Sequence, residues 1–119
     1  YFYGLSTGKV WVSISNDFGS TFTTTKVSIL NDGGGEKCWV PQDARYVQKI
    51  AKSGNNIHLV FMQMVDNSIS LRTPLYVRSA NNGVTFETAV DINNEIVDGT
   101  HIQSGQENIV AKGNYVYIN

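Results

Sequence analysis

Apolar and polar residues alternate with a period of two in several short stretches of this chain, at 10–15, 57–62 and 115–118. Successive side chains of a β-strand point to opposite faces, which produces this period. Both alternating sets are largely apolar in 57–65, so this run is predicted to be an inner strand buried on both faces. The run 21–29 is more polar and is predicted to be a wetter, outer strand. No stretch has the i, i+3, i+4, i+7 apolar spacing of a helix, so the sequence predicts an all-β chain.

Two different sequence signatures occur twice, in the same order. The segment 15–22 (SNDFGSTF) recurs 64 residues later as 79–86 (SANNGVTF). The segment 50–59 (IAKSGNNIHL) matches 110–118 (VAKGNYVYI) with one residue deleted at Ser53. Repetition at offsets of about 60 residues indicates one supersecondary unit, of which the chain holds just under two copies.

Strand positions follow from this repeat, with the four strands of one unit named A to D from inner to outer. The complete unit is expected to have strand A at 47–52, B at 56–65, C at 75–79 and D at 85–92. An earlier C and D are expected at 9–15 and 21–30, and a later A and B at 107–112 and 115–119. The expected order is therefore C-D, A-B-C-D, A-B.

The connections between these strands fall into two kinds. Because successive antiparallel strands alternate in direction, the A–B and C–D turns share one rim, and the B–C and D–A connections share the other. Links on the first rim are short and rich in Gly and Asn, at 53–55, 113–114 and the two recurring turns. Links on the second rim are long and irregular, at 31–46, 63–73 and 93–106. Binding residues are therefore expected on the second rim.

The recurring turns have a pattern with a physical logic, Ser-x-Asp-x-Gly-x-Thr-Phe. An acidic side chain in a tight turn accepts hydrogen bonds from nearby backbone N–H groups. The glycine supplies a backbone with positive φ, the threonine starts the outgoing strand, and the phenylalanine is expected to fold back onto the sheet. The second copy has an amide in place of the acid, so its turn should survive but be weaker. The residues are Ser15, Asp17, Gly19, Thr21 and Phe22 in one copy and Ser79, Asn81, Gly83, Thr85 and Phe86 in the other.

This pattern resembles the Asp-box, or bacterial neuraminidase repeat, of sialidase-like β-propellers. The resemblance extends over nearly the whole chain, because the two boxes and the matching A–B hairpins occur in the right order. It implies that residues 1–119 form about two four-stranded antiparallel blades of such a propeller, with no second domain. In that family the box is a structural element of the C–D turn, away from the active-site face. A metal or ligand site at the boxes themselves is the alternative interpretation.

Two blades cannot close a ring, so two arrangements are expected. The chain is either part of a single-chain propeller of about six blades or a unit that assembles with other copies into a ring. In the second arrangement, each copy lends its C-D pair to complete the A-B pair of a neighbour. The chain starts at Tyr1 rather than Met, which fits a processed form or an excised piece.

Composition excludes several functions. The net charge is −1 and no basic run of four residues occurs, so the electrostatic footprint of nucleic-acid binding is missing. No apolar run approaches the roughly 20 residues that cross a bilayer, and no signal peptide is visible. Cys38 is the only cysteine, interpreted as a small semi-buried apolar residue, and we expect no disulfide, metal site or cofactor. The family resemblance implies an extracellular or cell-surface location.

The longest loop of the second rim carries a cluster with sugar-binding chemistry. An aromatic ring can stack on a sugar face, and a guanidinium with nearby acceptors can bind hydroxyls. The alternative is that the tryptophan packs between blades and the acid and arginine form a solvated pair. The residues are Trp39, Gln42, Asp43, Arg45 and Tyr46.

Other candidates are weaker. The tripeptide Arg72–Pro74 resembles the Arg-Ile-Pro type motif that carries one arginine of the sialidase triad. It lies seven residues before Ser79, however, and is interpreted as a loop with Pro74 at the start of a strand. His58 is interpreted as a packed strand residue, and His101 is kept as a ligand-binding candidate. No catalytic residue is assigned.

Three functions remain open at this point. The first is a non-catalytic binding module that presents long loops to glycans or proteins. The second is a segment of a sialidase-type glycoside hydrolase whose catalytic residues lie mostly outside these 119 residues. The third is a structural surface or appendage domain.

Overall fold

The computed structural model describes residues 10–27, 38–39, 49–64, 72–92 and 108–119. Within these ranges the chain is built from antiparallel β-strands and contains no α-helix, as expected from the sequence. The strands are β1 (Trp11–Ile14), β2 (Thr23–Lys26), β3 (Cys38–Trp39), β4 (Ile50–Ser53), β5 (Asn56–Met64), β6 (Arg72–Ser79), β7 (Val90–Asp91), β8 (Ile109–Lys112) and β9 (Tyr115–Ile118).

The central sheet is a meander in which β4, β5, β6 and β7 pair in chain order. The short strand β3 pairs with β5 as well, with Trp39 opposite Met62. Since β6 occupies one edge of β5 along 57–64, β3 lies on the other edge, in line with β4. The expected order of strands A, B, C and D is thus the observed order of the central sheet.

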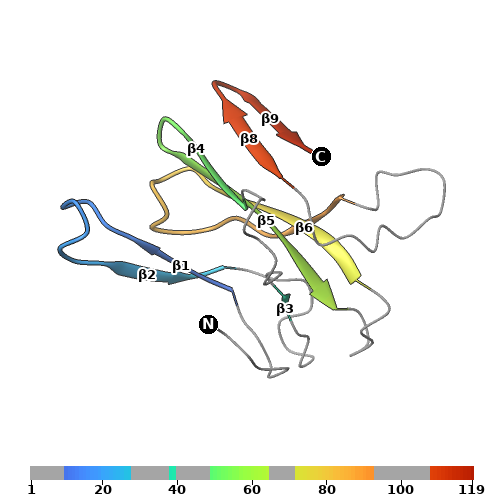
Figure 1. The fold of residues 1–119 in the computed structure, drawn as a ribbon, viewed down its shortest axis with the longest axis horizontal. Helices are drawn as coiled ribbons and strands as arrows, with labels where there is room; N and C mark the ends of the chain where they lie inside the picture. The colour runs from blue at the N-terminus through green and yellow to red at the C-terminus, as the bar shows by residue number, and fades with distance from the viewer. Residues whose placement is uncertain (1–9, 28–37, 40–48, 65–71, 93–107) are drawn as a thin grey trace.

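Two hairpins, β1–β2 and β8–β9, cover the two faces of the central sheet (Figure 1). The period-two pattern of β5 explains both contacts. Its odd-numbered residues pack with β1–β2, and its even-numbered Val60 packs with β8–β9. The cluster on the first face consists of Val10, Val12, Val27, Ile57, Leu59, Phe61, Leu75, Val77 and Ala89. The prediction that the 57–65 run is buried on both faces is confirmed for residues 57–63.

The hairpin turns lie on the same side of the molecule (Figure 1), and the β4–β5 turn is hydrogen-bonded to the β6–β7 and β8–β9 turns. The β4–β5 and β8–β9 turns are two-residue loops that begin with Gly54 at φ 60° and Gly113 at φ 58°. A glycine with positive φ at the first central position is typical of the type II′ hairpin turn. The expected Gly/Asn-rich rim of short turns is therefore present.

The ladder register corrects the alignment of the second repeat. Gly54 and Gly113 open equivalent turns, so Ser53 corresponds to Lys112 and Ala51 corresponds to Val110. The sequence alignment that matched Ala51 with Ala111 is therefore shifted by one residue from the structural equivalence. Because side chains alternate between faces, a shift of one residue moves a side chain to the other side of the sheet.

Strand C begins earlier than expected. It was predicted to start at Leu75, yet β6 begins at Arg72 and includes Pro74. The Arg78 carbonyl accepts a hydrogen bond from the Glu87 N–H, so the backbone groups of Arg78 face the β7 edge of β6. Backbone groups alternate between the two edges of a strand, so the Pro74 nitrogen faces the same edge. The described pairing of β7 ends opposite Leu75, and no ladder bond is lost at Pro74. The buried Thr73 hydroxyl donates to Asp91 Oδ1 at 2.6 Å, which fixes this end of the strand.

Strand D is shorter than expected, because only Val90–Asp91 of the run 85–92 is regular strand. Glu87 lies opposite Arg78 and Val90 lies opposite Tyr76, so three steps on the outer strand oppose two on β6. One extra residue of this kind is a bulge, which interrupts the ladder. The strand β3 was also missed, since its two residues fall inside the run 31–46 that was predicted to be loop.

Candidate functional site

The residues of the predicted sugar-binding loop lie outside the described residues, except for the backbone of Trp39 in β3. The same holds for His101. Trp39 pairs with Met62, which is six residues along β5 from its first residue at the short β4–β5 turn. The backbone of Trp39 therefore lies toward the rim opposite the short turns.

The first recurring turn, named here the Asp17 turn (15–22), is closed by a network centred on one carboxylate. Asp17 Oδ1 accepts hydrogen bonds from the Ser15 hydroxyl and the Thr21 N–H, both at 2.8 Å, and Asp17 Oδ2 accepts one from the Thr21 hydroxyl at 2.6 Å. Ser15 Oγ in turn accepts a hydrogen bond from the N–H of Gly19 at 2.7 Å. The Thr21 and Ser15 hydrogen bonds lower the pKa of Asp17 to about 2, because they favour the charged form.

The second recurring turn, the Asn81 turn (79–86), keeps the same geometry without the charge. Asn81 Oδ1 accepts hydrogen bonds from the Ser79 hydroxyl and the Thr85 N–H, both at 2.9 Å. Where the aspartate accepts from the threonine hydroxyl, Asn81 Nδ2 instead donates to Thr85 Oγ1 at 2.8 Å. Asparagine therefore preserves the acceptor that the turn requires, as the sequence predicted.

Two details of these turns differ from expectation. Phe86 packs against the central core, but Phe22 is 63% exposed, so the predicted packing is wrong for the first turn. The residues before the glycines, Phe18 and Asn82, have positive φ values of 57° and 55°. Asparagine tolerates this conformation, whereas a phenylalanine there is an outlier. Phe18 is also fully exposed, and nothing in its residue type predicts this placement.

The Asn81 turn is hydrogen-bonded to the β4–β5 turn, and the β4–β5 turn is hydrogen-bonded to the β8–β9 turn. Asn82 N–H donates to the Asn55 carbonyl at 2.9 Å. Ser53 Oγ donates to the Gly113 carbonyl at 3.2 Å. Two hydrogen bonds thus join three of the short turns in series, two of them within the central sheet and the third in β8–β9.

A polar pair, the buried His58 on β5 and the half-buried Tyr76 on β6, lies in the central sheet on the face covered by β8–β9. His58 Nδ1 and the Tyr76 hydroxyl are 2.8 Å apart, and the two rings are stacked with centroids 6.1 Å apart. Burial lowers the pKa of His58, and the nearby Arg78 guanidinium lowers it further. Burial likewise raises the pKa of the Tyr76 hydroxyl.

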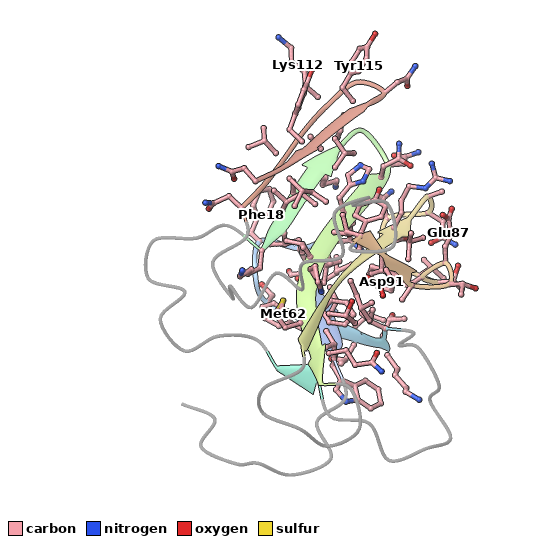
Figure 2. The ribbon with its side chains drawn as sticks, turned by 90° about the vertical axis from the view of Figure 1, so that its right-hand side faces the viewer. Phe18, Met62, Glu87, Asp91, Lys112 and Tyr115 are labelled. Atoms are coloured by element: carbon pink, nitrogen blue, oxygen red, sulfur yellow. The ribbon has the colours of Figure 1, made fainter. Side chains whose placement is uncertain are left out.

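Chemically, this pair is a neutral, shielded hydrogen bond rather than an acid–base site. His58 is 4% exposed, so a dissolved substrate does not reach its ring. Its Nε2 atom is buried and has no hydrogen-bond partner among the described residues. Beside the pair, Arg78 forms a bidentate ion pair with Glu87. Figure 2 shows Glu87 at the margin of the molecule. The interpretation of His58 as a packed strand residue is confirmed, but its partner Tyr76 was not anticipated from the sequence.

Arg72, the lookalike of a catalytic arginine, begins β6 opposite Met64. Among the described residues, no group of three or more His, Cys, Asp or Glu side chains is placed to hold a metal ion. The described ranges also contain no helix of the length and apolarity that a membrane crossing requires. No protein-family model matches the chain, and no curated protein or solved structure shows significant similarity to it.

Proposed function

We propose that this chain is a segment of a sialidase-like β-propeller that acts as a non-catalytic binding module, presenting its long loops to extracellular glycans or proteins. Three antiparallel sheets stacked face to face are the arrangement that neighbouring propeller blades adopt. The two recurring turns support the same interpretation, since each occurs at a C–D position and is closed by the Ser, Asp/Asn and Thr side chains of the repeat.

One observation carries the proposal: along one rim, the β4–β5 turn is hydrogen-bonded to the Asn81 turn and to the β8–β9 turn. Asp17 and Asn81 on that rim use their side-chain acceptors for hydrogen bonds within their own turns. Ligand contacts are therefore assigned to the opposite rim. The backbone of Trp39 lies toward that rim, and Gln42, Asp43, Arg45 and Tyr46 follow it closely in the sequence.

A glycan array followed by titration calorimetry tests this assignment. Trp39→Ala and Arg45→Ala should each reduce binding at least about tenfold, as expected for an aromatic anchor or a charged contact at a binding site. Phe22→Ala is the matched control, because Phe22 is an aromatic residue that is 63% exposed in the Asp17 turn and lies outside the proposed site. Equal losses in all three variants, or no glycan bound by the wild-type chain, would contradict the proposal.

The enzymatic alternative has its own readout. Hydrolysis of a fluorogenic sialoside by a protein containing this segment, lost on changing an arginine of a strand A, would replace the binding-module proposal by the glycosidase one. Arg72→Ala is not expected to affect such an activity, because Arg72 belongs to β6, a strand C. Absence of glycan binding together with a defined self-assembled state would favour a structural domain.

A further inference from the structure

The two covering hairpins each end in a strand edge that no described residue pairs. In β8–β9, Asn108 and Asn119 exchange backbone hydrogen bonds, so by alternation Val116 and Ile118 direct their N–H and C=O groups away from β8. In β1–β2, Val27 N–H donates to Val10, so Trp11 and Ser13 direct theirs away from β2. Open edges of this kind are templates for strand addition.

The central sheet shows how these two edges would meet. By the repeat, β9 corresponds to β5, because Gly113 corresponds to Gly54, and β1 corresponds to β6, because Ser15 corresponds to Ser79. In the central sheet Leu59 pairs with Val77. Val60 N–H donates to Lys49 on the β4 side, so Leu59 directs its backbone groups toward β6.

Transferring that register to the hairpins places Ile118 opposite Ser13 and Val116 opposite Ser15. The residues that fall opposite one another are those whose backbone groups point outward. The register comes from the repeat and the outward direction comes from the hydrogen bonds of each hairpin, so the two observations agree independently.

Side-chain exposure also supports the pairing of the β9 edge with the β1 edge. On the outer face of β8–β9, Val110, Tyr115 and Tyr117 are 56%, 69% and 64% exposed (Figure 2 shows Tyr115 projecting outward). The positions in the central sheet that correspond to Val110 and Tyr117 are Ala51 and His58, which are buried.

Trp11 shows the same difference at the other hairpin. Its ring is 58% exposed, whereas Leu75, the corresponding residue of the central sheet, is fully buried. Faces that are covered in the middle of the molecule are thus uncovered at its two ends.

We propose that the occupant of these edges and faces is a second copy of this chain: β9 of one copy pairs antiparallel with β1 of the next and completes a four-stranded sheet β8-β9-β1-β2. Opposite residues share a face, so Trp11 of the second copy turns toward the central sheet of the first. Tyr117, opposite Ile14 of the second copy, turns toward the second central sheet. The contact is head-to-tail, and closed rings of four to eight such sheets correspond to about two to four copies.

Size-exclusion chromatography with light scattering on the 119-residue chain, over a range of concentrations, tests the proposal. We expect a mass of about two to four times 13.1 kDa. A folded monomer at all concentrations would overturn it.

Ser13→Pro is the diagnostic variant, because it removes an outward N–H without removing a bond of the β1–β2 ladder. Assembly should weaken about tenfold or more. Ser13→Ala is the matched control, since both variants lose the 2.8 Å hydrogen bond between the Ser13 and Thr24 hydroxyls but only the proline loses the N–H. Equal assembly of the two variants would count against β1 as the edge.

If Ser13→Pro does not fold, Trp11→Lys replaces it, because this exposed position tolerates a charge in the monomer but not in the completed sheet. Amide hydrogen exchange gives a second readout. The N–H groups of Ser13, Val116 and Ile118 should be protected in the assembly and exchange rapidly in dissociated chains. An assembly in which these amides exchange rapidly would overturn the proposed pairing. This inference does not depend on glycan binding, so failure of one proposal leaves the other intact.

Discussion

Gly19 and Gly83 occupy equivalent positions in the two recurring turns, yet alanine should be far more damaging at the second. Both glycines have positive φ, 88° and 82°. A methyl group added at Gly19 would meet no atom within 4 Å. At Gly83 it would overlap the Cδ1 methyl of Ile14 and lie 3.3 Å from Ile57 Cδ1. The comparison therefore separates backbone strain, common to both sites, from packing, which is present at only one.

The magnitudes follow from these two contributions. A side chain forced into the left-handed region costs about 1–2 kcal/mol, and this is the whole expected cost of Gly19→Ala. Gly83→Ala adds the displacement of the flexible end of Ile14, about 0.5–1.5 kcal/mol for an off-rotamer side chain, and a tight contact with Ile57. We expect Gly83→Ala to exceed Gly19→Ala by about 1–2 kcal/mol.

Urea unfolding at one fixed, low protein concentration measures both variants, provided that the slope with denaturant stays constant. Ile14→Val removes the overlapped methyl, so it should cost less in the Gly83→Ala background than in the wild type. In the Gly19→Ala background it should be additive. Equal destabilisation by the two alanines, or additivity in both double mutants, would refute the packing argument.

Three further predictions concern single groups. Phe18→Asn should raise the free energy of unfolding by about 0.5–1 kcal/mol in the same urea assay, because asparagine accepts positive φ and the exposed ring loses no packing. The pKa of Asp17 is lowered from 3.8 to about 2, so its contribution to stability is complete above pH 3.8 and is lost as the pH falls toward 2. Thermal melting at several pH values should show this loss in the wild type but not in Asp17→Asn. The pKa of His58 lies below 6.5 in the folded chain, so stability should fall as the pH drops below 6.5. An NMR titration of the His58 ring with a midpoint at or above 6.5 would contradict this assignment. In His58→Phe, the loss of stability below pH 6.5 should be absent.

The predicted site and the observed polar clusters were accessible from the sequence to different degrees. The hydrogen bonds of Asp17 and Asn81 could be predicted because they join residues at most four positions apart, so local turn chemistry determines them. The His58–Tyr76 pair could not, because it joins residues 18 positions apart through the register of two strands. The only available signal was a histidine within an apolar strand, which indicates burial but does not identify a partner.

The sequence by itself determined the all-β class, the order of strands A to D in the central sheet and the chemistry of the short turns, but not β3 or the bounds of strands C and D. Alternation, glycine positions and the repeat are local properties, and they correctly gave the meander of the central sheet and the two-sided burial of β5. Only the tertiary structure decided the register of β4 and β8, the bulge before β7, the packing of Gly83 and the open edges of β1 and β9. These features depend on which faces and edges meet across the molecule, and a one-residue shift that hardly changes a sequence match reverses the direction of every side chain on a strand.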